Sequence, residues 1–292
     1  MFQRVLICTD FSDGLHRLAH FIPSLALAGI KQIVFLHVAG LSEGAIPRVD
    51  TEKVEQAKTR LTSAVGEISN SVEVKIEVQS GKPVETILKV AQTHNTQLII
   101  LGSQSRDLLT EKLVGSTMSD LSKRTKIPLL VLRPQLIFTY TSEELTLRCQ
   151  HLFRSLLIPY NGTEVANHLV QQVKNLAQQQ SGKFLERCKL CWVLQDSSRR
   201  EIPRKIQPQQ ASETLSQIKT DLEAVNLQIE TDVLKGHSVS KILEVAGMSD
   251  ISAIAVSSGT IGKLQEWLVS SFAAELLRHS WFPILFFPRG TL

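Results

Sequence analysis

The sequence predicts an α/β protein built from two duplicated domains, each with an open sheet of five parallel strands. The chain has 292 residues, about twice the usual size of a domain. Residues 81–130 align without a gap to residues 236–285, at an offset of 155. Within each copy, short apolar runs alternate with segments of helical spacing, the pattern of parallel strands joined by helices.

The boundaries follow from this repeat. Gly81 aligns with Gly236 and Pro128 with Pro283, whereas Val5 aligns with Leu156 at a different offset, so the second copy carries a small insertion. We expect a first domain over residues 1–135 and a second over residues 154–292. The mixed polar segment between them, residues 136–153, is predicted as a linker.

The elements of the first copy follow from their patterns of apolar residues. Residues 97–101 are a strand in which four apolar residues follow Gln97. Residues 49–68 set charged residues against an apolar face, and Pro83 stands in the first turn of its helix. The predicted strands are residues 4–9, 32–38, 71–78, 97–101 and 128–132. The predicted helices are residues 15–28, 49–68, 82–93 and 113–124.

The second copy repeats this scheme element by element. The predicted strands are residues 155–158, 190–194, 228–233, 251–256 and 283–286. The predicted helices are residues 164–178, 212–225, 239–246 and 266–278.

Composition limits the class of protein. Hydrophobic residues make up 43% and charged residues 21%, the balance of an ordinary globular chain. A net charge of +4 is too small to indicate nucleic acid binding. No apolar stretch has the length of a signal-peptide core or a membrane span, and four cysteines do not make a disulfide framework, so we expect a cytoplasmic protein with no membrane partner.

Acidic, glycine and hydroxyl residues that could bind a ligand follow two strands of the first copy. Asp10 follows the first strand, Gly102 ends the fourth, and Gly115, Ser116 and Thr117 open the next helix. Ligands of open parallel sheets bind at carboxyl strand ends, and a helix N-terminus reached through glycines favours an anion. The two hydroxyls can donate to phosphate, while Asp10 can accept from ribose hydroxyls or hold a metal such as Mg²⁺. These residues predict a nucleotide cleft.

Four motifs in order resemble the universal stress protein family, over almost the whole chain: Thr9-Asp10-Phe11-Ser12, Leu36-His37-Val38, Ser80-Gly81-Lys82-Pro83 and Gly102-x2-Ser105-x9-Gly115-Ser116. The resemblance implies a Rossmann-like fold of the adenine nucleotide alpha hydrolase type and a site for ATP or AMP. It also implies that Asp10 contacts the ligand and that the backbone of Val38 meets the adenine.

The sequence departs from the family pattern at Ser105, where nucleotide-binding members carry glycine. If this position requires a positive φ, serine costs about 1 kcal/mol relative to glycine. Serine also adds bulk beside the phosphates, although its hydroxyl offers a hydrogen bond.

The second copy lacks the chemistry of the first. Asn161 replaces the acid, and the loop reads Ser257-x2-Thr260-x9-Ser270-Ser271, so all three glycines are absent. We expect no nucleotide in the second domain.

The predicted function is a stress-response regulator or sensor that binds adenine nucleotide in the first domain. Two other functions stay open: an interaction scaffold without nucleotide, and a weak ATP hydrolase, although the sequence offers no identifiable general base. The resemblance further implies that the chain pairs with itself through its last strands, residues 128–132 and 283–287, as a pseudo-dimer.

Several of these residues also have purely structural interpretations. Asp10 with Ser12 can simply cap the helix that begins near Leu15, and Gly102 and Gly115 can serve only as tight turns. Three further features are expected to be structural rather than functional: the pair Cys188 and Cys191, the pair His16 and His20, and the basic loop in residues 196–214.

Overall fold

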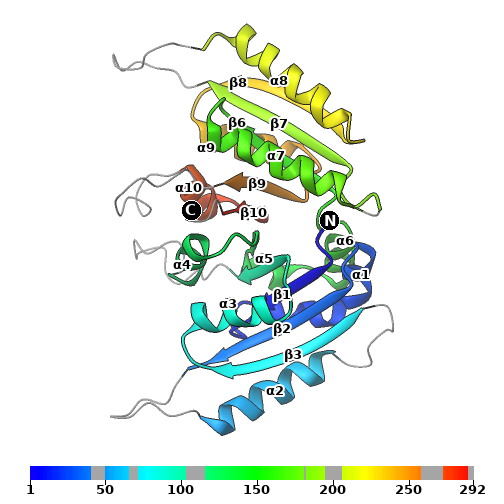
Figure 1. Ribbon diagram of the computed structural model, residues 1–292, viewed down its shortest axis with the longest axis vertical. Coiled ribbons are helices and arrows are strands. Elements are labelled where there is room, and N and C mark those ends of the chain that lie inside the picture. The colour runs from blue at the N-terminus through cyan, green and yellow to red at the C-terminus, as the bar shows by residue number, and fades with distance from the viewer. Residues whose placement is uncertain are drawn as a thin grey trace. The chain divides into compact units, whose positions relative to one another are not determined.

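The computed structural model describes residues 1–40, 50–65, 72–102, 116–180, 182–194, 206–257 and 272–288. Its contacts divide the chain into two compact units, chiefly Phe2–Leu152 and Phe153–Arg289. Each unit is an α/β domain with a parallel five-stranded sheet, so the predicted fold class is confirmed (Figure 1).

The first unit has the strand order β3-β2-β1-β4-β5. Its strands are β1 (Arg4–Cys8), β2 (Gln32–Ala39), β3 (Glu73–Ser80), β4 (Leu98–Gly102) and β5 (Leu129–Leu132). Its helices are the 3₁₀ helix η1 (Leu15–Phe21), then α1 (Ile22–Leu27), α2 (Thr51–Val65), α3 (Pro83–Thr93), α4 (Ser116–Arg124), α5 (Pro134–Thr139) and α6 (Ser142–Gln150).

The second unit repeats this order as β8-β7-β6-β9-β10. Its strands are β6 (Ser155–Tyr160), β7 (Arg187–Leu194), β8 (Gln228–Lys235), β9 (Ala253–Ser257) and β10 (Ile284–Phe287). Its helices are α7 (Glu164–Gln178), α8 (Pro208–Glu223), α9 (Ser238–Met248) and α10 (Phe272–His279).

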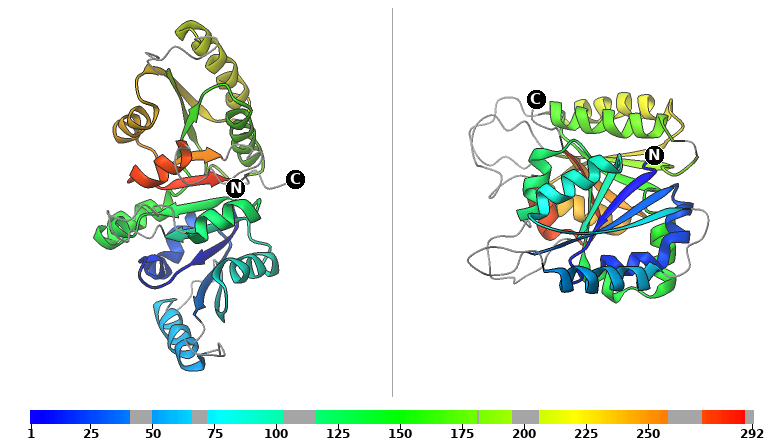
Figure 2. Two further views of the ribbon diagram at one scale, coloured as in Figure 1. Left: turned by 90° about the vertical axis from the view of Figure 1, so that its left-hand side faces the viewer. Right: turned by 60° about the horizontal axis from the view of Figure 1, so that its bottom comes forward.

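Helices cover both faces of each sheet, as Figure 2 shows within each unit. In the first unit α2 contacts η1 while α3 contacts α4, and in the second unit α8 contacts β8 while α9 contacts α10. The central strands therefore need side chains that are apolar on both faces. Leu6, Ile7, Ile99 and Ile100 are completely buried, as are Leu156 to Ile158 in the second unit. Within the described ranges, no helix combines the length and apolar character needed to cross a bilayer.

The segment between the copies differs from its prediction as a linker. Residues 136–153 hold most of α5 and all of α6, and both helices pack on η1, so they fold as part of the first unit. Helix α6 begins with a capping box, in which Thr141 accepts from the Glu144 backbone and the Glu144 side chain accepts from the Thr141 backbone. Leu145 and Cys149, four residues apart, are its buried face.

The order of the strands fixes where a ligand can bind. In the first unit β1 lies between β2 and β4. From β1 the chain adds β2 and β3 on one side of the sheet, and then β4 and β5 on the other side. The carboxyl ends of β1 and β4 are thus the topological switch point, where open parallel sheets carry their sites.

Candidate functional site

Most of the predicted site residues that the structure describes meet at one edge of the first sheet. Asp10 follows β1, Gly102 ends β4, and Val38 lies two residues beyond Leu36, which pairs with Cys8. Helix α4 returns from this edge to β5 and begins with Ser116, which is exposed, and Thr117, which is half-buried. Ser105 and Gly115 lie outside the described residues.

Asp10 holds a turn rather than a helix. Its Oδ1 accepts from the Ser12 backbone N–H at 2.9 Å, from the Ser12 hydroxyl at 2.7 Å and from the Asp13 N–H at 3.1 Å. The N-cap of η1 is Gly14, at φ +70°, and it carries no side-chain cap. The capping alternative for Asp10 and Ser12 is therefore wrong. Asp10 is exposed at the switch point, where its carboxylate faces solvent.

The acid that the sequence did not single out is Asp13, which is only 6% exposed. Its Oδ1 accepts from the Thr9 hydroxyl at 2.7 Å and from the Leu15 N–H at 2.9 Å, and its Oδ2 accepts from the Asp10 N–H at 3.2 Å. Burial raises the pKa of Asp13, and the hydrogen bonds from Thr9 and Leu15 oppose that rise. Asp13 is thus an internal organiser of the loop.

Gly102 is required by this buried acid. A Cβ built on Gly102 would lie 2.5 Å from the Cβ of Asp13 and 3.2 Å from its Cγ. The backbone of Gly102 is outside the left-handed region, so its lack of a side chain serves close approach rather than a special turn. Sequence spacing could not reveal this contact, because Gly102 ends β4 whereas Asp13 lies in the loop after β1.

An aromatic cluster covers the turn. Phe11 has φ +65°, and its ring centroid lies 4.7 Å from that of His37 and 5.8 Å from that of His16, with the Arg60 guanidinium 4.4 Å from it. His37 is fixed by a contact of 2.9 Å between its Nδ1 and the Thr9 carbonyl oxygen. Burial lowers the pKa of His16, and the charges of Arg60 and Arg17 add to this effect. The cluster joins the end of β2, beside Val38, to the loop after β1.

Equivalent positions in the second unit follow from strand register. Val5 pairs with Ile33, and its counterpart Leu156 pairs with Cys188. Positions in β1 and its loop therefore translate to the second unit by adding 151. Positions from β2 onward translate by adding 155, the offset seen in the sequence repeat.

The second unit keeps the turn and changes its interior. Asn161, the counterpart of Asp10, accepts from the Thr163 hydroxyl at 2.7 Å and from its N–H at 3.3 Å. Glu164, the counterpart of Asp13, is exposed in the first turn of α7. Ser257 stands at the position of Gly102, and its hydroxyl donates to the Phe287 carbonyl at 2.8 Å.

The remaining candidate residues show no arrangement suited to redox chemistry or metal binding in the part of the chain that the structure describes. Cys188 and Cys191 are buried, and burial raises the pKa of each thiol to about 12, so both are neutral near pH 7. Among the described residues, no three histidine, cysteine or acidic side chains gather closely enough to hold a metal ion. Most of the basic loop predicted in residues 196–214 lies outside the described ranges, and its C-terminal part belongs to α8.

Comparisons with known proteins cover both units. Residues 1–133 and 152–288 each match the family model described as the universal stress protein family. The universal stress protein MJ0577 of Methanocaldococcus jannaschii is 24% identical over 155 residues, which are 46% of this chain and 96% of that protein.

Two solved structures are similar over nearly the full chain. A universal stress protein from Archaeoglobus fulgidus has a TM-score of 0.68 and 17% identity, and covers 98% of both chains. A functionally unknown protein, PA1789 from Pseudomonas aeruginosa, has a TM-score of 0.57 and 13% identity, over 98% of this chain and 92% of that one. At these identities the likeness concerns the fold.

Proposed function

Because the chain belongs to the universal stress protein family, we propose that its first unit binds an adenine nucleotide, ATP or AMP, as a stress-response regulator or sensor. The observation that carries the proposal is the meeting of Asp10, Val38, Gly102 and the start of α4 at one topological switch point. This edge brings together an exposed carboxylate, a strand end and a helix N-terminus.

Each residue has a role that its chemistry allows. The exposed carboxylate of Asp10 accepts from ribose hydroxyls, and the backbone of Val38 meets the adenine. Ser116 and Thr117 place two hydroxyls at the N-terminus of α4, where the helix dipole favours phosphate. By the family motif, Gly115 belongs to the phosphate loop, and Ser105 stands in this loop where the motif has glycine.

The donor set fits a nucleotide better than it fits a free metal ion. Asp13 is buried beneath the turn, whereas Asp10 is exposed, so Asp10 is the carboxylate that a Mg²⁺ carried by the phosphates would meet. Mg²⁺ would neutralise phosphate charge there.

The second unit is proposed to bind no nucleotide. It has a neutral amide at Asn161 where the first unit has a carboxylate, and Phe272 where the first unit has the hydroxyl of Thr117. Pairing of the chain with itself through residues 128–132 and 283–287 stays a separate prediction.

The test uses a matched pair of exposed residues in the same turn. Isothermal titration of ATP and of AMP should show one nucleotide bound per wild-type chain. Asp10→Ala should weaken binding about tenfold, or about 1.4 kcal/mol, because a charge-assisted contact to ribose is lost. Asn161→Ala, which breaks the equivalent turn, should leave the affinity unchanged.

The other outcomes identify the rival functions. Equal losses in the two variants would contradict the assignment of the site to the first unit. No binding of either nucleotide to the wild type would favour the scaffold, whereas steady phosphate release from ATP would favour the hydrolase.

A further inference from the structure

The second unit contains a pocket of about 540 Å³ at the carboxyl edge of its own sheet. The lining comes from the ends of β6, β7 and β9 and from the first turns of α7, α9 and α10. This volume lies within the range of about 300–1,000 Å³ that is usual for small-molecule sites.

The inner wall of this second-unit pocket is apolar. Ala166 and Leu169 come from α7, Ile242 from α9, and Ala255 from β9, and all four side chains are buried. A ligand that enters the pocket therefore exchanges water for hydrocarbon along this inner wall.

Side chains on the inner wall of the pocket are smaller than their equivalents in the first unit. Five buried lining positions differ in this way, and the larger residues of the first unit are all buried. The replacements, first unit to second, are Leu15 to Ala166, Leu36 to Cys191, Ile100 to Ala255, Leu101 to Val256 and Met118 to Ala273. Other lining positions carry larger residues than the first unit, among them Tyr160 for Thr9, Val165 for Gly14 and Phe272 for Thr117, so the shape of the site differs between the units.

The side chains around the pocket offer little positive charge. Of the described residues that line it, none is lysine or arginine, Glu275 is the one carboxylate, and His237 is an exposed histidine at the N-cap of α9. Burial raises the pKa of the Cys191 thiol in the wall to about 12, so this group is also uncharged. Polar atoms lie at the rim, on the exposed residues Asn161 and Thr163.

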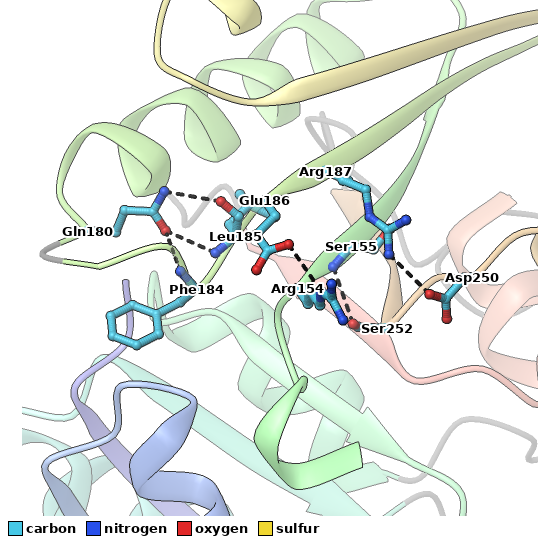
Figure 3. A network of polar contacts seen from close by, with 9 residues as sticks. All are labelled: Arg154, Ser155, Gln180, Phe184, Leu185, Glu186, Arg187, Asp250 and Ser252. Atoms are coloured by element: carbon cyan, nitrogen blue, oxygen red, sulfur yellow. Dashed lines mark hydrogen bonds and ion pairs between the residues drawn. The ribbon is translucent and has the colours of Figure 1, made fainter. Parts of the chain in front are cut away.

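A second hollow in the same unit is less suited to a ligand. It measures about 970 Å³, lies at the amino edge of the sheet, and is lined by Gln180 and Glu186 among others. The Gln180 carboxamide accepts from the Leu185 N–H at 2.9 Å, and the Glu186 carboxylate pairs with Arg154 at 3.1 Å (Figure 3). The Arg154–Glu186 ion pair joins the amino ends of β6 and β7, and the Gln180 carboxamide holds the chain that leads into β7. These polar groups therefore already have partners within the protein.

We propose that the second-unit pocket binds a neutral, mainly apolar small molecule, with any polar group of the ligand at the rim beside Asn161 and Thr163. The site is the positional counterpart of the nucleotide site but has different chemistry. It does not depend on whether the first unit binds nucleotide.

The test uses the neutral dye N-phenyl-1-naphthylamine, which becomes fluorescent in apolar sites. Wild-type protein should bind the dye saturably, with one molecule per chain. Val193 lines the pocket and is half-buried, so Val193→Trp should fill the mouth and weaken dye binding at least tenfold. Val38→Trp is the matched control, because Val38 is the equivalent residue of the first unit; it should keep full dye binding while it impairs nucleotide binding.

A second variant covers a failure of Val193→Trp to fold. Ala273→Met restores the side chain that the first unit carries at this position and fills the pocket from inside, so it should also weaken dye binding at least tenfold. Circular dichroism and thermal unfolding establish that each variant is folded. Dye binding that survives both pocket variants, or that only Val38→Trp abolishes, overturns the proposal, as does a wild type without saturable binding.

Discussion

The loops that follow β1 and β6 have the same hydrogen-bonded turn but opposite interiors. Asp10 and Asn161 each accept from the hydroxyl two residues later, at 2.7 Å in both units. Beneath this shared turn the first unit buries an acid, Asp13, whereas the second exposes its counterpart Glu164. Duplication has therefore preserved the backbone turn that follows the first strand of each unit, while the side-chain chemistry around that turn has diverged.

A single position on the neighbouring strand accompanies this difference. Gly102 leaves room for Asp13, because any Cβ there would lie 2.5 Å from the Cβ of the acid. Ser257 has a Cβ at the same place and uses its hydroxyl to bind Phe287. The glycine and the buried acid therefore form a pair that the second unit has lost together.

The largest expected effect comes from removing the buried acid. Asp13→Ala leaves the buried Thr9 hydroxyl and the Leu15 N–H without their acceptor, so the free energy of unfolding should fall by about 1–3 kcal/mol. Glu164→Ala removes an exposed acid from the first turn of α7 and should cost less than about 1 kcal/mol. Urea denaturation of both variants measures the difference. Equal losses would show that burial of Asp13 carries no special energetic role.

A smaller effect should appear as a dependence on pH. The folded-state pKa of Asp13 is raised, so its proton is held more tightly in the folded than in the unfolded protein. The resulting stability is complete below the unfolded pKa of about 3.9 and is lost as the pH rises through the folded pKa. Wild type should therefore lose stability relative to Asp13→Asn, which does not titrate, as the pH increases from about 3.5 toward neutrality.

Urea denaturation at several pH values in this window gives the comparison. A constant gap between wild type and Asp13→Asn across the window would contradict the raised pKa.

Most of the fold could be predicted from the sequence, because the strands are buried on both faces and read as apolar runs. β4 and β9 are examples, since each has four consecutive buried residues and each lies where its run predicted. The ends of strands were harder to predict. β7 begins at Arg187, three residues before the predicted start, because Arg187 and Lys189 interrupt the apolar pattern at the start of the strand.

The helices α5 and α6 were not predicted. Their buried contacts come from a few side chains such as Ile137 and Leu145, set among polar residues, so the average composition resembles a linker. The capping box of Thr141 and Glu144 is a signal in the sequence that marks the start of α6.

The candidate site could be predicted only in part. Motif spacing located Asp10, Val38, Gly102, Ser116 and Thr117, all near one sheet edge, while Ser105 and Gly115 stay predictions outside the described residues. The role of Asp13 depends on its approach to Gly102, far away in sequence, which no local pattern contains. The pocket of the second unit could not be predicted for a similar reason, because its lining residues come from strands and helices that are far apart in sequence.

If the two strand-end sites bind ligands of different chemistry, both should be occupied at the same time, which equilibrium dialysis with both ligands present measures. At saturating ATP and N-phenyl-1-naphthylamine, we expect one nucleotide and one dye molecule bound to the same chain. Titration of each ligand in the presence of the other should give the affinity that it shows alone. Two nucleotides per chain, or displacement of the dye by ATP, would contradict it.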